Sequence, residues 1–140
     1  MWLRHEFPWI GRGFIHAIDD DYATKFQQDL ARLGFEVVVL DGGAMLDEPA
    51  FWAEVADAFE FPDYFGKNWD AFHDCFGDLA LPRRLAVVWR NADAVARQQL
   101  KLLTEAIAVL HETFRQLQEC QGIVVLTGGG AGFARPPARG

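Results

Sequence analysis

Serine is missing from this chain of 140 residues, and cysteine occurs only twice, as Cys75 and Cys120. Without serine there is no serine nucleophile, and two cysteines cannot build the disulfide framework of a small secreted domain. Buried free thiols are the expectation for both cysteines, because unpaired cysteines are among the most often buried residues. The sequence therefore offers no activated nucleophile and no disulfide scaffold.

Long apolar runs are missing as well. Stretches such as residues 37–40 (VVVL) and 123–126 (IVVL) are far too short to cross a bilayer. The first thirteen residues lack the continuous apolar region of a secretory signal. Hydrophobic residues nevertheless make up 51% of the chain and aromatic residues 14%, which is enough to bury a core. We expect a cytoplasmic, folded protein without membrane contact.

Positive charge is scarce in one part of the chain. Residues 41–80 contain ten aspartates and glutamates but a single base, Lys67, which gives a local charge of about −9. The other residues carry ten acids and twelve bases, or about +2. Direct binding of nucleic acid is disfavoured because phosphate contacts need lysine and arginine. Two interpretations stay open: a surface that attracts a basic partner, and a solvated acidic face that aids solubility.

Three runs predict buried strands, at residues 35–42, 84–89 and 122–127. Each is rich in β-branched residues, nearly continuous in apolar residues, and bounded by glycine, proline or aspartate. Exposed antiparallel strands usually alternate, whereas buried parallel strands look like these runs. Residues 13–18 are a weaker candidate, which would add a fourth strand at the edge of the sheet.

Helical segments separate the predicted strands. Residues 47–59 begin with Asp47 as an N-cap and have Pro49 in the first turn. The aspartates at 19–21 favour the start of another helix, which Gly34 ends. Residues 92–118 contain one apolar stripe expected to pack on the sheet: Leu100, Leu103, Ile107, Leu110, Phe114 and Leu117. The pattern predicts an α/β fold, a small parallel sheet of three strands, or four with residues 13–18, covered by helices.

This order of elements divides the chain into three parts. Residues 1–34 are expected to form a strand–helix extension packed on the domain, residues 35–127 the domain, and residues 128–140 a flexible tail rich in glycine and proline. The glycines of the tail follow a strand, but no helix pattern and no Lys–Ser/Thr pair completes a phosphate-binding loop.

The candidate site lies in residues 61–79, FPDYFGKNWDAFHDCFGDL. Gly66 is free to adopt a positive φ, and Asn68 is a good N-cap for a helix that opens at Trp69. One side of this helix carries a stripe expected to be buried: Trp69, Phe72, Phe76 and Leu79. Asp70, His73 and Asp74 fall on the exposed side, with Tyr64 and Gly66 at the helix entrance.

Simpler interpretations exist for each of these residues. Asp70 complements the helix dipole, and Asp74 lies four residues from a like charge, a mildly unfavourable spacing. His73 is open to interpretation as a surface residue, and Tyr64 as a packed aromatic. A metal site needs further ligands, and glycosidase carboxylates need a sugar-sized cleft between them. We expect no catalytic residue, metal or cofactor; a hydrolase using Asp70 and Asp74 is the weaker alternative.

The pattern Y-F-G-x-N-x-D-A-F-x-D-C at residues 64–75 resembles the barstar family of ribonuclease inhibitors. The order of strands and helices over residues 35–127 resembles that family too. The resemblance implies a non-enzymatic inhibitor, or immunity protein, that is a monomer when free. Such an inhibitor inserts its loop and helix into the active site of a guanyl-preferring ribonuclease. A module of the same fold that binds a different toxin or another protein is the alternative.

The resemblance also implies roles for individual residues. Asp74 matches the family's central acid, which takes the place of an RNA phosphate among arginine and histidine side chains of the enzyme. Asp70 matches a second acid, and Tyr64 and Gly66 match loop contacts. The partner-binding residues expected in this chain are therefore Tyr64, Gly66, Asn68, Asp70, His73 and Asp74. Three positions differ from the well-known members: His73 replaces a tryptophan, Lys67 replaces an acid, and Gln116 stands at another acidic contact.

Overall fold

The computed structural model describes residues 7, 15–79, 82–116, 120–130 and 132–134. Its elements in chain order are β1 (Ile15–Asp19), α2 (Asp20–Arg32), β2 (Glu36–Asp41), the 3-10 turn η1 (Gly42–Ala44), α3 (Glu48–Ala58), α4 (Trp69–Gly77), β3 (Arg84–Arg90), α5 (Ala92–Gln98), α6 (Leu100–Gln116) and β4 (Gln121–Gly128). Strands alternate with helices, and the predicted α/β class is confirmed.

The four strands form one parallel sheet in the order β1-β4-β3-β2. The central strands β3 and β4 are buried along nearly their whole length, as their continuous apolar sequences predict. The weaker candidate at residues 13–18 is confirmed over residues 15–18 as the edge strand β1, which pairs with β4 and places Ile18 opposite Thr127; residues 13 and 14 lie outside the described residues. The other edge is β2, which is only partly covered.

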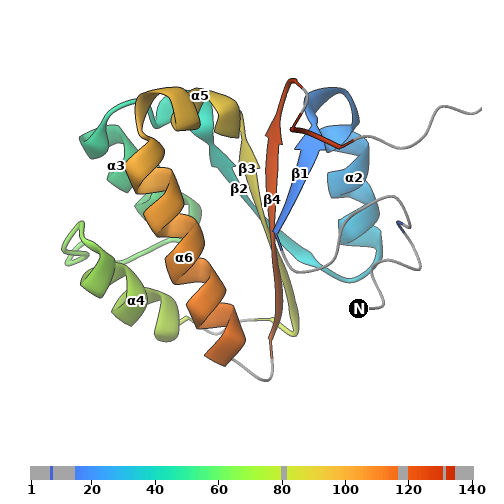
Figure 1. Ribbon diagram of the computed structural model, residues 1–140. Helices are drawn as coiled ribbons and strands as arrows, with labels where there is room; N and C mark the ends of the chain where they lie inside the picture. Colours follow the sequence, from blue (N-terminus) through green and yellow to red (C-terminus); the bar gives the residue numbers. More distant parts are fainter. Residues whose placement is uncertain (1–6, 8–14, 80–81, 117–119, 131, 135–140) are drawn as a thin grey trace, which may run out of the picture.

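Helices cover both faces of the sheet, so that the sheet is the middle of three layers (Figure 1). Helix α2 lies on one face, and α3, α4 and α6 lie on the other. Side chains of β3 alternate between two apolar clusters, with Ala86 and Val88 on the α2 side and Val87 and Trp89 in the larger cluster. This two-sided cover explains why the middle of each central strand, residues 85–89 and 122–126, is entirely apolar.

The helix ends follow the predicted capping residues. Asp19 Oδ1 accepts a hydrogen bond from Asp21 N at 2.9 Å, and α2 begins at the next residue. At the other end Gly34 has a φ of +92°, and Phe35 N donates to Leu30 O at 3.0 Å. This Schellman arrangement needs a left-handed residue, which glycine adopts without strain. It turns the chain so that Phe35 enters the core just before β2.

The segment 92–118 departs from the predicted single stripe. It forms two helices, α5 and α6, separated at Gln99, whose side chain donates to Leu46 O at 3.2 Å. Leu103, Leu110 and Phe114 are buried and Ile107 partly so, but Leu100 is 58% exposed and Leu117 lies outside the described residues. Helical side chains lean over the turn that precedes them. Leu100 is the first residue of α6 and has no such turn, so it leaves the buried stripe.

Residues beyond β4 partly return to the sheet. Ala134 N donates to Ala17 O, and Asp19 N donates to Ala134 O, both at 2.8 Å. The division of the chain at residues 34 and 127 stays a prediction, as does the flexibility of the tail. In the part of the chain described above, no helix is long and apolar enough to span a membrane.

Deleting residues 1–33 tests the contribution of β1 and α2. Ile18, Phe26 and Leu30 are fully buried there, and each contributes roughly 1.5–3 kcal/mol by burial. We expect urea unfolding to show a loss of about 5 kcal/mol or more, and size-exclusion chromatography to show self-association through the exposed β4 edge. A chain lacking only residues 136–140 is the control. Equal stability of the 34–140 chain and the full chain would contradict this assignment.

Candidate functional site

Asn68 sets the start of α4, as predicted. Its Oδ1 atom accepts a hydrogen bond from Ala71 N at 2.8 Å, and its Nδ2 atom donates to Gly66 O at 3.2 Å. The side chain therefore satisfies a free N–H of the first helical turn and fastens the preceding loop to it. Asn68 therefore links the end of the loop to the start of α4.

The positive φ in the loop is at Lys67, not at Gly66. The predicted position was wrong: Lys67 has a φ of +56°, and Gly66 is not among the described glycines with positive φ. Asn68 needs an extended backbone to cap the helix, and it has a φ of −146° and a ψ of 171°. The chain reverses one residue earlier, at Lys67. A left-handed conformation costs a non-glycine residue about 1–2 kcal/mol, so strain is stored beside the cap.

The inner side of α4 is aromatic and closely packed. Phe72 lies 5.6 Å from Phe61 and Phe76 lies 5.9 Å from Phe114, both measured between ring centroids in edge-on contacts. Trp69 and Leu79 are partly buried against the same cluster. The predicted buried stripe is therefore confirmed.

Both cysteines are buried free thiols, as expected. Burial raises the pKa of the Cys75 thiol, and the carboxylates of Asp78 and Asp74 raise it further. Burial also raises the pKa of the Cys120 thiol. Since the thiolate is the reactive form, neither cysteine is activated as a nucleophile.

The outer side of α4 carries the predicted polar residues. Asp70, His73 and Asp74 are all exposed, with 85% of the Asp74 side chain accessible to solvent. His73 Nδ1 lies 3.9 Å from Asp74 Oδ1. Tyr64 is 79% exposed in the loop before the helix, so it is not a packed aromatic.

Among the described residues, the one basic side chain within ion-pair distance of either aspartate is His73. Within the described ranges, no lysine or arginine forms an ion pair with Asp70 or Asp74. Asp63 and Asp78 are exposed at the two ends of the same segment and add to the negative charge. Across those ranges, no group of three or more histidine, cysteine, aspartate or glutamate side chains could hold a metal ion. The outer side of α4 is therefore a negatively charged, solvent-exposed surface.

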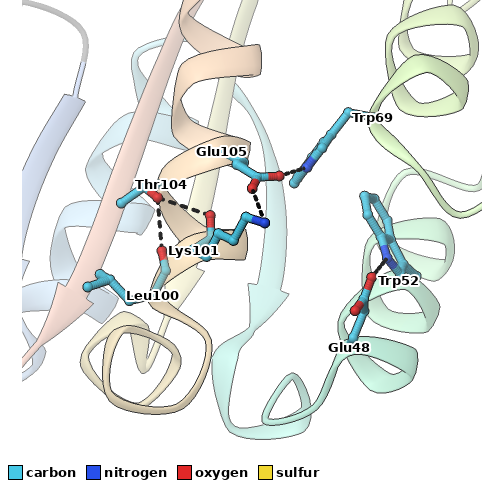
Figure 2. A network of polar contacts seen from close by, with 7 residues as sticks. All are labelled: Glu48, Trp52, Trp69, Leu100, Lys101, Thr104 and Glu105. Carbon is cyan, nitrogen blue, oxygen red and sulfur yellow. Dashed lines mark hydrogen bonds and ion pairs between the residues drawn. The ribbon is translucent and has the colours of Figure 1, made fainter.

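One contact of α4 could not be predicted from any pattern in the sequence. Trp69, which was predicted only as a buried residue, donates its indole N–H to the Glu105 carboxylate on α6 (Figure 2). Thirty-six residues separate the two, and only the packing of α4 beside α6 brings them together. A pocket lies next to this contact, lined by residues of α3, α6 and the turn before α4.

Residues 35–126 match the protein family described as Barstar (barnase inhibitor). The match begins at the residue before β2 and includes α4, its loop, α6 and most of β4; β1 and α2 lie outside it. No curated protein sequence matches the chain.

Replacing Asn68 tests the control of α4 by its cap. We expect Asn68→Ala to lower the free energy of unfolding by about 1 kcal/mol, and Asn68→Ser to lower it much less, because serine also caps well. Urea unfolding measures the loss, and amide hydrogen exchange at residues 71–74 measures local fraying. Asp47→Ala, which removes the cap of α3, is the control and should leave exchange in α4 unchanged. Unaltered exchange in Asn68→Ala would show that the cap does not hold α4.

Proposed function

The chain belongs to the barstar family, described as that of a barnase inhibitor, and from this membership we propose that it inhibits a guanyl-preferring ribonuclease. The inhibitor blocks the active site of the enzyme with α4 and the loop before it, and it catalyses no reaction. The observation that carries the proposal is the exposed pair Asp70 and Asp74, which has no lysine or arginine partner in the described chain. We place the protein in the cytoplasm as a monomer until it meets the enzyme.

Asp74 supplies the central contact in this mechanism. A ribonuclease binds RNA phosphates with arginine and histidine side chains, and a carboxylate offers the same cations two negatively charged acceptor oxygens. Arginine can hold a carboxylate with two parallel hydrogen bonds. The Asp74 carboxylate is 85% exposed and has no lysine or arginine partner among the described residues, so it is available to the cations of the enzyme. Asp70, one turn earlier on the same side, reaches the rim of the same cationic site.

The loop and His73 complete the contact surface. Tyr64 presents an exposed aromatic ring, the kind of side chain that often dominates binding energy at protein interfaces. Gly66 exposes its backbone to the partner, and Asn68 holds that backbone against α4. His73 offers a flat ring next to Asp74, where the imidazole can stack on the partner as a tryptophan would.

The alternative is a partner other than a ribonuclease. Two exposed residues favour it: Lys67 adds a positive charge at the loop, and His73 gives a smaller ring than tryptophan. Inhibition assays against a panel of basic ribonucleases, with barnase as the first member, distinguish the two functions. If the chain neither inhibits nor binds any ribonuclease of the panel, the result favours a partner of another kind.

Asp74→Ala should damage inhibition more than any other single change on α4. Removing one member of a buried charge pair at an interface costs about 2–5 kcal/mol, a range that includes pairs of the barnase–barstar complex. Titration of barnase activity and calorimetry measure the loss. Asp78→Ala, with the same change of charge at the end of α4, is the control and should inhibit like the parent. If Asp78→Ala lost more inhibition than Asp74→Ala, the interface would lie elsewhere.

Association should depend strongly on salt. The ten acids of residues 41–80 attract a basic enzyme over long range at low ionic strength. At about 0.5 M salt the screening length falls to roughly 4 Å, so the attraction is lost. We expect stopped-flow association rates to fall at least tenfold between low salt and 0.5 M salt. When Asp57 and Asp63 are replaced by asparagine and Glu60 by glutamine, the association rate should fall less over the same range. A rate that is constant over this range would rule out steering by the acidic segment.

A further inference from the structure

A pocket of about 260 Å³ opens beside the turn that leads into α4. It lies between the first two turns of α3, residues 67–69 and the first two turns of α6. Its lining contains two tryptophans, two carboxylates and two lysines, which are Trp52, Trp69, Glu48, Glu105, Lys67 and Lys101. The inhibitory mechanism proposed above uses none of them.

The two carboxylates of the pocket are held in place by the two indoles. Trp52 Nε1 donates to Glu48 Oε1 at 3.4 Å, and Trp69 Nε1 donates to Glu105 Oε2 (Figure 2). The rings of Trp52 and Trp69 pack at an angle of 64°, with centroids 4.7 Å apart. A carboxylate has about four acceptor positions, so each one keeps capacity for a further donor. The pocket therefore combines oriented carboxylates with aromatic walls.

This combination fits a guanidinium group. Arginine binds a carboxylate with two hydrogen bonds and stacks on an indole face, which lysine does less well. A volume of about 260 Å³ lies below the ~300 Å³ at which pockets for drug-sized ligands begin, so a single side chain fits better than a cofactor. The acids of residues 41–80 around the turn also favour a cation.

The lysines of the pocket do not exclude an arginine. Lys101 Nζ lies 3.8 Å from Glu105 Oε1, but the lysine side chain is 90% exposed. An exposed ion pair of this kind is weak and easily displaced. Lys67 is exposed as well, and its flexible side chain can move into solvent. A bound arginine would take the place of the Lys101 ammonium at Glu105.

We propose that this pocket takes up an arginine side chain of the basic protein that α4 binds. The partner in this inference rests on the proposed function, whereas the chemistry of the pocket does not. Residues 67–69 line the pocket and directly precede Asp70, so a protein docked on Asp70 and Asp74 lies next to the pocket. The pocket is then a second anchor beside the acidic surface of α4.

The affinity for arginine can be measured without any partner protein. The probe is N-acetyl-arginine amide, followed by NMR of the indole N–H groups of the ¹⁵N-labelled chain; the uncharged N-acetyl-citrulline amide is the control. We expect the signals of Trp52 and Trp69 to shift with the arginine compound only. Lys101→Ala should tighten this binding severalfold, because it removes the competing ammonium, and Glu105→Gln should weaken it severalfold while keeping an acceptor for Trp69. Equal shifts with citrulline, or unchanged binding in both variants, would overturn the proposal.

An inhibition assay with barnase tests the pocket proposal and the proposed function independently. Glu105→Gln should weaken inhibition about three- to tenfold, whereas Asp20→Asn, the same loss of charge at an exposed position of α2 on the other face of the sheet, should not. If Asp74→Ala abolishes inhibition but Glu105→Gln does not weaken it and the arginine probe does not bind, only the pocket proposal fails. If the arginine probe binds while neither Asp74→Ala nor any other change on α4 affects inhibition, the pocket stands and the proposed inhibitory surface fails.

Discussion

The aromatic layer beneath α4 is the constraint on which the rest of the site depends. The rings of Phe72 and Phe76 are stacked at 5.6 Å, and Phe59 meets both of them edge-on. Helix α4 has only nine residues, and a helix of that length is not stable in water by itself. Its stability comes from burying one side against this layer. The opposite side must then face solvent, which is where the two aspartates stand.

The interaction energies explain why two like charges are tolerated on the outer side of α4. Repulsion between Asp70 and Asp74, four residues apart on a helix, amounts to a few tenths of a kcal/mol. Asp70 in the first turn recovers a similar amount from the helix dipole. Each buried phenylalanine below contributes about 1.5–3 kcal/mol. Packing therefore exceeds the charge repulsion by roughly an order of magnitude, and residues on the outer side can change without unfolding the helix.

Features that depend on neighbouring residues were predictable from the sequence, and features that depend on tertiary packing were not. The caps at Asp47 and Asn68 and the buried side of α4 follow from local hydrogen bonding and from a 3.6-residue period. The exposure of Leu100 depends on where α6 begins, and the contact of Trp69 with Glu105 depends on how α4 packs beside α6. No local pattern carries that information. The binding roles of the outer residues depend on a partner that the chain does not contain.

Trp69 links the two surfaces proposed to bind the partner. Its ring packs on Phe72 of α4 and on Phe51 and Trp52 of α3, and its N–H group holds Glu105 of α6. One side chain therefore joins three helices at the point where the pocket meets the start of α4. Asp70 directly follows this residue in the chain and Glu105 is hydrogen-bonded to it, so the core side chain that positions the pocket also stands at the start of the acidic helix. A preorganised pair of anchors loses little conformational entropy on binding, and it selects partners whose cations have the matching separation.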